Sequence, residues 1–164
     1  MYTDKSEKIR SGLQKGFQDG TSKLAKRKCY GYDTAKDGEL TINQGEAEVV
    51  RWIFDQYLNG MSSGKIVAEL SKRGITSPTG KPKWNREAID KLLSNEKYTG
   101  RVLLQKTVSF CDIQIRNDGF AAKYLYENAH DPIISDEMFQ EVQRKKLRRS
   151  KNSGKEIVAP MIFC

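Results

Sequence analysis

The sequence has little cysteine, little histidine and no long apolar run. Its three cysteines, Cys29, Cys111 and Cys164, are odd in number and far apart, so we expect reduced thiols and no disulfide framework. No segment approaches the roughly 20 apolar residues that a membrane span needs, and the N-terminus lacks the apolar region of a secretion signal. These absences favour a cytoplasmic protein.

Residues that carry catalysis in other proteins are equally scarce. The single histidine, His130, is expected to order a turn. Cys29 and Cys111 have no histidine near them in the sequence, so we interpret them as inert small residues. The carboxylates Glu46 and Glu48 suit the start of a helix, where acidic groups interact favourably with the helix dipole. The sequence therefore predicts no active site, and we expect no cofactor.

Charge is plentiful and unevenly distributed. Lys and Arg number 29 against 21 Asp and Glu, which gives a net charge of +8 and a pI near 9.4. The positive excess lies in residues 1–32 (+5), 62–110 (+6) and 136–164 (+3), and acidic segments separate these blocks. Clustered cations gain most from counterion release, so the pattern favours a polyanionic partner over a uniformly solvated surface. Double-stranded nucleic acid is the first candidate.

The first basic block predicts a helix followed by an arm. Ile9, Leu13 and Phe17 stand four residues apart and mark one face of a helix over 6–19. Residues 21–32 show no clear period and carry four cations: Lys23, Lys26, Arg27 and Lys28. We expect an extended arm that follows a DNA groove, because the negative potential of the minor groove attracts Arg and Lys.

Residues 33–58 predict a hairpin and a helix. The Asp-Gly turn signal at 37–38 lies between short apolar segments and predicts a small hairpin. Asn43 followed by Glu46 resembles a capping box, and apolar residues then recur at helical spacing over 47–58.

Two short helices should follow. Ser62 caps the first of them, and Asn85 caps a second over 86–93, with Trp84 as a hydrophobic staple packed on that helix. A helix pair of this kind resembles a helix-turn-helix, although the loop over 75–83 is longer than the usual connection.

The remaining segments predict strands and a last helix. Alternating apolar residues predict one half-buried strand over 101–110, a partner strand at 113–115 and a third strand at 124–126. Ser135 caps a last helix, which we expect to dissolve into the basic run 144–151. The fold class is α+β: a mainly helical domain with a small antiparallel sheet and a helix-turn-helix-like pair.

Several short motifs occur in a specific order. They are YGY at 30–32, EAEVVRWIFDQY at 46–57, GITSPTG at 74–80, Trp84, LLSNEKYTG at 92–100, HDPIIS at 130–135 and Phe139. No single motif is diagnostic, but together their order and spacing resemble the recombinase domain of large serine recombinases, the integrases and transposon resolvases of phages and mobile elements.

The resemblance implies a domain organisation. In that family an N-terminal domain carries a nucleophilic serine, and a long helix leads from it across the DNA to a DNA-binding domain. Residues 1–20 would then be the tail of that helix, 21–32 a linker arm, 33–151 the DNA-binding domain and 152–164 a linker toward a truncated zinc ribbon. The catalytic serine domain is expected to be absent, so this chain should not cut DNA. Cys164 resembles the approach to a first zinc ligand, but a zinc site needs about four ligands, so we expect no metal.

Ten residues are our candidates for DNA contact, four on the arm and six around the second short helix. They are Lys23, Lys26, Arg27, Lys28, Thr79, Lys81, Lys83, Asn85, Arg86 and Lys91. Arg and Asn can make bidentate contacts to guanine and adenine, whereas Lys and Thr more often hold phosphates. Arg86 stands at the first helical position, where recognition helices present side chains, whereas its role as a cap already explains Asn85.

The function implied is sequence-specific binding of double-stranded DNA at attachment sites. The intact recombinase would act as a homo-oligomer on bacterial, nucleoid-associated DNA during integration or transposition. The alternative is a stand-alone helix-turn-helix transcription regulator that binds DNA as a dimer. An RNA-binding module fits less well, because the aromatic residues are scattered and suggest no stacking platform. An autonomous nuclease or recombinase would relax supercoiled plasmid, and we expect no such activity.

Overall fold

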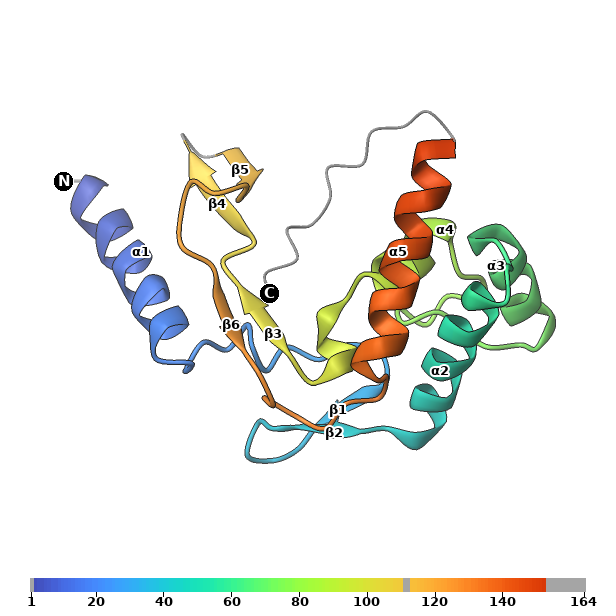
Figure 1. Ribbon diagram of the computed structural model, residues 1–164. Helices are drawn as coiled ribbons and strands as arrows, with labels where there is room; N and C mark the ends of the chain where they lie inside the picture. Colours follow the sequence, from blue (N-terminus) through green and yellow to red (C-terminus); the bar gives the residue numbers. More distant parts are fainter. Residues whose placement is uncertain (1, 111–112, 153–164) are drawn as a thin grey trace.

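A bundle of four helices forms one side of the molecule in the computed structural model, which describes residues 2–110 and 113–152 (Figure 1). The helices are α2 (Gln44–Leu58), α3 (Ser63–Lys72), α4 (Arg86–Leu93) and α5 (Asp136–Asn152). Each turns apolar residues into one shared core, which includes the fully buried Val50, Ile53, Phe54, Ile66, Leu70, Ile89, Leu93 and Val142. The predicted α+β fold with its helix pair is confirmed.

Polar caps start α2, α3 and α4 at the predicted residues. The side chains of Asn43, Ser62 and Asn85 each accept a hydrogen bond from the backbone N–H three residues later, at 2.7–3.3 Å. The predicted capping box is confirmed for the Asn43 side chain and wrong for Glu46. Instead of turning back to the N–H of Asn43, the Glu46 carboxylate accepts from the N–H of Gly31 at 2.8 Å, and the N–H of Asn43 donates to the carbonyl of Gly31 at 3.0 Å. Glu46 therefore joins α2 to the start of the hairpin.

The hairpin consists of β1 (Tyr32–Thr34) and β2 (Leu40–Ile42), as the sequence predicted. Gly38 has φ +84°, a value that glycine adopts without strain in such a turn. The ring of Tyr32 is fully buried, and its hydroxyl donates to the carbonyl of Asp131 at 2.8 Å. The hairpin is thus fastened beneath the bundle.

The predicted single strand over 101–110 is wrong. The structure has two pairs, β3 (Val102–Leu104) with β6 (Tyr124–Tyr126) and β4 (Thr107–Phe110) with β5 (Ile113–Arg116). The extended conformation is interrupted at Gln105, where φ is +61°. The fully buried Asn117 holds the backbone in this conformation. Its amide donates to the carbonyl of Gln105 at 2.9 Å and its backbone N–H donates to the carbonyl of Lys106 at 2.8 Å. The expected third strand, β6, consequently pairs with β3 in a separate sheet.

Helix α1 (Tyr2–Gln18) lies on the far side of the sheets from the bundle (Figure 1). The hydroxyl of Tyr126 on β6 reaches the carbonyl oxygens of Phe17 and Gln18 and so anchors the end of α1. The predicted stripe is exposed at Ile9 and Leu13. Over the part of the chain that the structure describes, no helix combines the length and apolar character needed to cross a membrane.

Candidate nucleic-acid interface

The helix pair α3 and α4 carries most of the predicted contacts. Ser63, the first residue of α3, donates through its hydroxyl to the Asp90 carboxylate of α4 at 2.7 Å, which adds a polar contact between two helices that share the buried core. The loop between them is ordered by its own hydrogen bonds, with the N–H of Ser77 donating to the carbonyl of Lys81 at 2.8 Å. The indole of Trp84 is buried and donates to the carbonyl of Ile75 at 3.2 Å, so it closes the loop instead of offering a stacking surface.

The predicted residues on this loop and helix are all exposed: Thr79, Lys81, Lys83, Asn85, Arg86 and Lys91. They differ in whether their side chains already have a polar partner within the protein. Lys91 forms an ion pair with Glu87 at 2.8 Å, and the side-chain oxygen of Asn85 accepts the hydrogen bond that caps α4. The side chains of Lys81 and Lys83 form no ion pair or hydrogen bond with any described residue, so both ammonium groups are available to a ligand.

Arg86 lies against α3. A Cβ atom placed on Gly64 would stand 3.0 Å from Nε and 3.1 Å from Nη2 of Arg86, so the guanidinium rests on the bare backbone of that glycine. Among the described residues the Arg86 side chain has no hydrogen-bond or ion-pair partner, which leaves its donors unoccupied.

The arm is folded and not extended, which corrects the prediction. The N–H of Ala25 donates to the carbonyl of Ser22 at 3.0 Å, which closes a turn. Lys97 holds this turn from the other side, because its ammonium group donates to the carbonyls of Leu24 at 3.4 Å and Arg27 at 2.8 Å. Burial lowers the pKa of Lys97. A residue some 70 positions along the chain therefore sets the shape of the arm.

Two of the four arm cations are neutralised by carboxylates, and the other two are not. Lys26 forms an ion pair with Glu39, and Lys28 forms one with Asp33 at 3.1 Å. Lys23 and Arg27 are exposed, and their side chains form no ion pair or hydrogen bond within residues 2–110 and 113–152. Of the four arm cations, Lys23 and Arg27 therefore offer unneutralised charge to a ligand.

The arm ends beside the start of α4. The ring of Tyr30 meets that of Trp84 edge-on at a centroid distance of 5.1 Å, and the carbonyl of Tyr30 accepts a hydrogen bond from Tyr98 at 2.8 Å. Trp84 lies two residues before Arg86, so the fold brings together the two segments that were predicted separately.

The third basic block serves the fold instead. Helix α5 continues through the run where it was expected to dissolve, because its cations donate to carbonyl oxygens of α2, of α4 and of the connection that follows α2. Lys145 donates to Leu58 at the end of α2, Lys146 donates to Asp90 of α4 at 3.0 Å, and Arg149 donates to Gly60 at 2.9 Å. Cations near the C-terminal end of a helix are favoured by its dipole.

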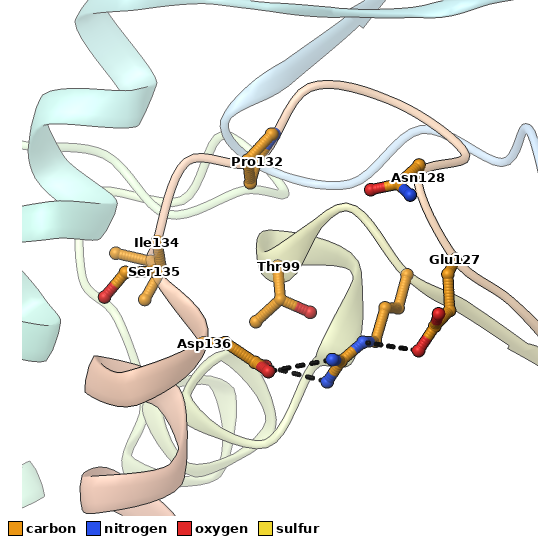
Figure 2. Close-up of a pocket in the computed structure, with 8 residues that line it drawn as sticks. Thr99, Glu127, Asn128, Pro132, Ile134, Ser135 and Asp136 are labelled. Atoms are coloured by element: carbon orange, nitrogen blue, oxygen red, sulfur yellow. Dashed lines mark hydrogen bonds and ion pairs between the residues drawn. The ribbon is translucent and has the colours of Figure 1, made fainter.

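A cavity of about 280 Å³ lies between the sheets and the start of α5 (Figure 2). Among the described residues that line it, the one cation is Arg101, which binds the Asp136 carboxylate through two hydrogen bonds of 2.7 and 2.8 Å and lies 3.7 Å from Glu127. Because two carboxylates surround this guanidinium, the cavity is not suited to an anion. The cluster instead ties β3 to α5.

The remaining candidate side chains occupy structural positions. Nε2 of His130 lies 2.6 Å from the carbonyl of Lys97, an atom that can only accept, so Nε2 carries the proton. Burial raises the pKa of Cys29 to about 11, the opposite of what a nucleophilic thiol needs. Among the described residues, no cluster of three or more metal-binding side chains is found. Cys111, Cys164 and the predicted linker beyond Asn152 lie outside the described residues.

The site and fold together define a basic α+β domain that presents a helix pair beside a short cationic turn. The family described as Recombinase matches residues 44–149, and the chain belongs to this family, that of the large serine recombinases. It is 29% identical to a large serine recombinase solved in a complex with DNA, with a TM-score of 0.51 over 79% of this chain and 35% of that one. A structure from work on the sequence requirements of the Listeria innocua prophage attP site is also 29% identical, with a TM-score of 0.52 over 78% and 46%. The chain thus spans less than half the length of either protein.

Proposed function

We propose that this chain binds double-stranded DNA in a sequence-specific way, at the attachment site of a large serine site-specific recombinase that carries out integration or transposition. We assign it the domain boundaries expected from the sequence: helix tail, arm, DNA-binding domain and linker. DNA cleavage is assigned to a catalytic serine domain outside this chain. In the intact recombinase the domain would act within a homo-oligomer on DNA.

The observation that carries this proposal is the junction of arm and helix at Tyr30 and Trp84. It joins the exposed cations Lys23 and Arg27 to the segment that holds Arg86. The structural likeness to a recombinase in complex with DNA supports the same ligand. Arg86 would read base edges, and the lysines and Thr79 would hold phosphates.

Selection of binding sites from random duplexes by the 164-residue chain tests the proposal. We expect a defined preferred sequence, and Arg86→Ala should relax the preference at one or two base pairs, at a cost of about 1–3 kcal/mol. Lys81→Ala should instead weaken binding to all duplexes alike, because a phosphate contact carries no sequence information. Double-stranded RNA of matched length serves as a competitor, and it should displace the DNA poorly.

Two results would remove the proposal. One is a chain that binds no duplex at low ionic strength, and the other is a chain that binds every duplex equally. A separate incubation with supercoiled plasmid tests the assignment of cleavage to another domain, and we expect no relaxation.

A further inference from the structure

Gly64 occupies the second position of α3 and lies against the side chain of Arg86. The three heavy atoms nearest to a Cβ placed there all belong to the guanidinium of Arg86: Nε at 3.0 Å, Nη2 at 3.1 Å and Cζ at 3.2 Å. Real Cβ atoms rarely come so close to other atoms, so any side chain at this position would have to push the guanidinium away.

The space left by Gly64 accommodates the Arg86 guanidinium, and no polar partner among the described residues holds it there. The first turn of α3 is the positive end of the helix dipole, which does not attract a cation. Nor does any described residue hold the guanidinium by a hydrogen bond or an ion pair. The absence of a side chain on Gly64 leaves room for the guanidinium, while the packing of Ile66 and Leu70 in one core with Ile89 sets the spacing of α3 and α4.

We propose that Gly64 is a positioning residue that determines specificity by seating the Arg86 guanidinium. This inference rests on the proposed function, since it gives Gly64 a role only if Arg86 reads DNA. Alanine at position 64 would displace the guanidinium by a few tenths of an ångström or into another rotamer. Hydrogen bonds to base edges tolerate little such change, because they hold heavy atoms about 2.7–3.2 Å apart and weaken when misaligned.

The chain offers a matched control in Gly45, the second residue of α2. A Cβ at Gly45 would meet only the side-chain oxygen of its own cap, Asn43, at an ordinary 3.7 Å. Both substitutions replace glycine by the best helix former at the same helical position, so neither G64A nor G45A should lower the Tm. They differ in the neighbour of the new methyl group, which is the Arg86 guanidinium at close range in G64A and the Asn43 oxygen at an ordinary distance in G45A.

The experiment is a double-mutant cycle on the full 164-residue chain. Fluorescence anisotropy gives the Kd for the selected duplex and for duplexes changed at single base pairs, with wild type, G64A, R86A, the double variant and G45A. G64A should reduce the preference at the base pair that R86A relaxes, by about three- to tenfold, because touching residues commonly couple this strongly. In the R86A background G64A should have no effect, and G45A should match wild type. G64S, which carries the same Cβ, should repeat the G64A result.

The outcomes separate the two proposals. If R86A relaxes the preference while G64A and G64S leave it intact, the role of Gly64 is refuted and DNA recognition stands. The role is equally refuted if G64A acts as strongly without Arg86, or if R86A leaves every base preference unchanged. A wild-type chain without any duplex preference would refute the proposed function itself.

Discussion

Replacing Arg149 by alanine should destabilise the fold while leaving the DNA contacts in place. The guanidinium lies 4.4 Å from the centroid of the Tyr57 ring and donates to the carbonyls of Gly60 at 2.9 Å and Met61 at 3.3 Å. A hydrogen bond from a charged donor contributes about 1.5–3 kcal/mol, and a cation–π contact at a partly exposed site about 0.5–1 kcal/mol. The bond to Gly60 is exposed to solvent, so water replaces part of it, and we expect a loss of about 1.5–3 kcal/mol in the free energy of unfolding.

Arg148 is the matched control, one residue earlier on the same helix. It is exposed and has an ion pair to Glu141 at 3.5 Å. Exposed ion pairs contribute little, so R148A should change the free energy of unfolding by less than about 0.5 kcal/mol. Both variants lose one positive charge from the same turn, so any long-range electrostatic effect on DNA binding should be equal in the two.

Urea unfolding followed by circular dichroism measures the difference, and a Tm lowered by about 3–12 °C in R149A is the corresponding thermal result. DNA binding is then measured at several salt concentrations below the unfolding transition. Equal stabilities of R149A and R148A would refute the structural role of Arg149. The structural role would also be refuted if the slope of log K against log salt concentration showed the loss of about one phosphate contact in R149A and none in R148A.

Three further predictions concern buried and exposed groups. Trp84→Ala should cost about 3–5 kcal/mol of unfolding free energy, whereas Trp84→Phe, which keeps most of the ring packing, should cost about 1–3 kcal/mol; chemical denaturation distinguishes them. Burial lowers the pKa of His130 below its ordinary 6.5, so its contribution to stability should be full above pH 6.5 and fall as the solution becomes more acidic; His130→Gln should flatten this part of a Tm–pH series. Arg27→Ala should weaken duplex binding more than Lys26→Ala, because Glu39 already neutralises Lys26; titrations at one salt concentration decide, and equal losses would contradict it.

Local signals in the sequence were sufficient for the helices. A cap such as Asn43 or Asn85 acts on backbone groups three residues away, so its effect is visible in a short window of sequence. The Asp-Gly turn of the hairpin is equally local, and it was predicted correctly. The candidate residues on the helix pair were chosen from the same kind of local signal, because Arg86 follows a recognisable cap.

The errors arose where a distant residue decides the conformation. Asn117 breaks the strand at Gln105 from twelve positions away, and Lys97 folds the arm from 70 positions beyond Arg27. Neither residue differs in the sequence from an ordinary turn asparagine or a surface lysine. Gly64 was also missed, because its role depends on the packing of α3 against α4, which no local pattern specifies.

The distribution of ion pairs makes a last prediction about salt. Eight of the ten candidate residues are cations, and three of them are already paired with carboxylates: Lys26, Lys28 and Lys91. These pairs are exposed and weak, so a phosphate can displace the carboxylate, but the displaced acid stays nearby and repels the phosphate. Of the five unpaired cations, Arg86 is assigned to base edges, so we expect four phosphate contacts, those of Lys23, Arg27, Lys81 and Lys83, to release counterions from the DNA.

Each phosphate contact contributes about −0.9 to the slope of log K against log salt concentration, so these four contacts predict a slope of about −3.6, whereas seven contacts, with the three paired lysines included, predict a slope of about −6.3. Binding of the 164-residue chain to its selected duplex between about 50 and 200 mM salt separates the two values. A slope near −6 would refute this expectation, because it would mean that Glu39, Asp33 and Glu87 yield their lysine partners to the DNA and do not limit the interface.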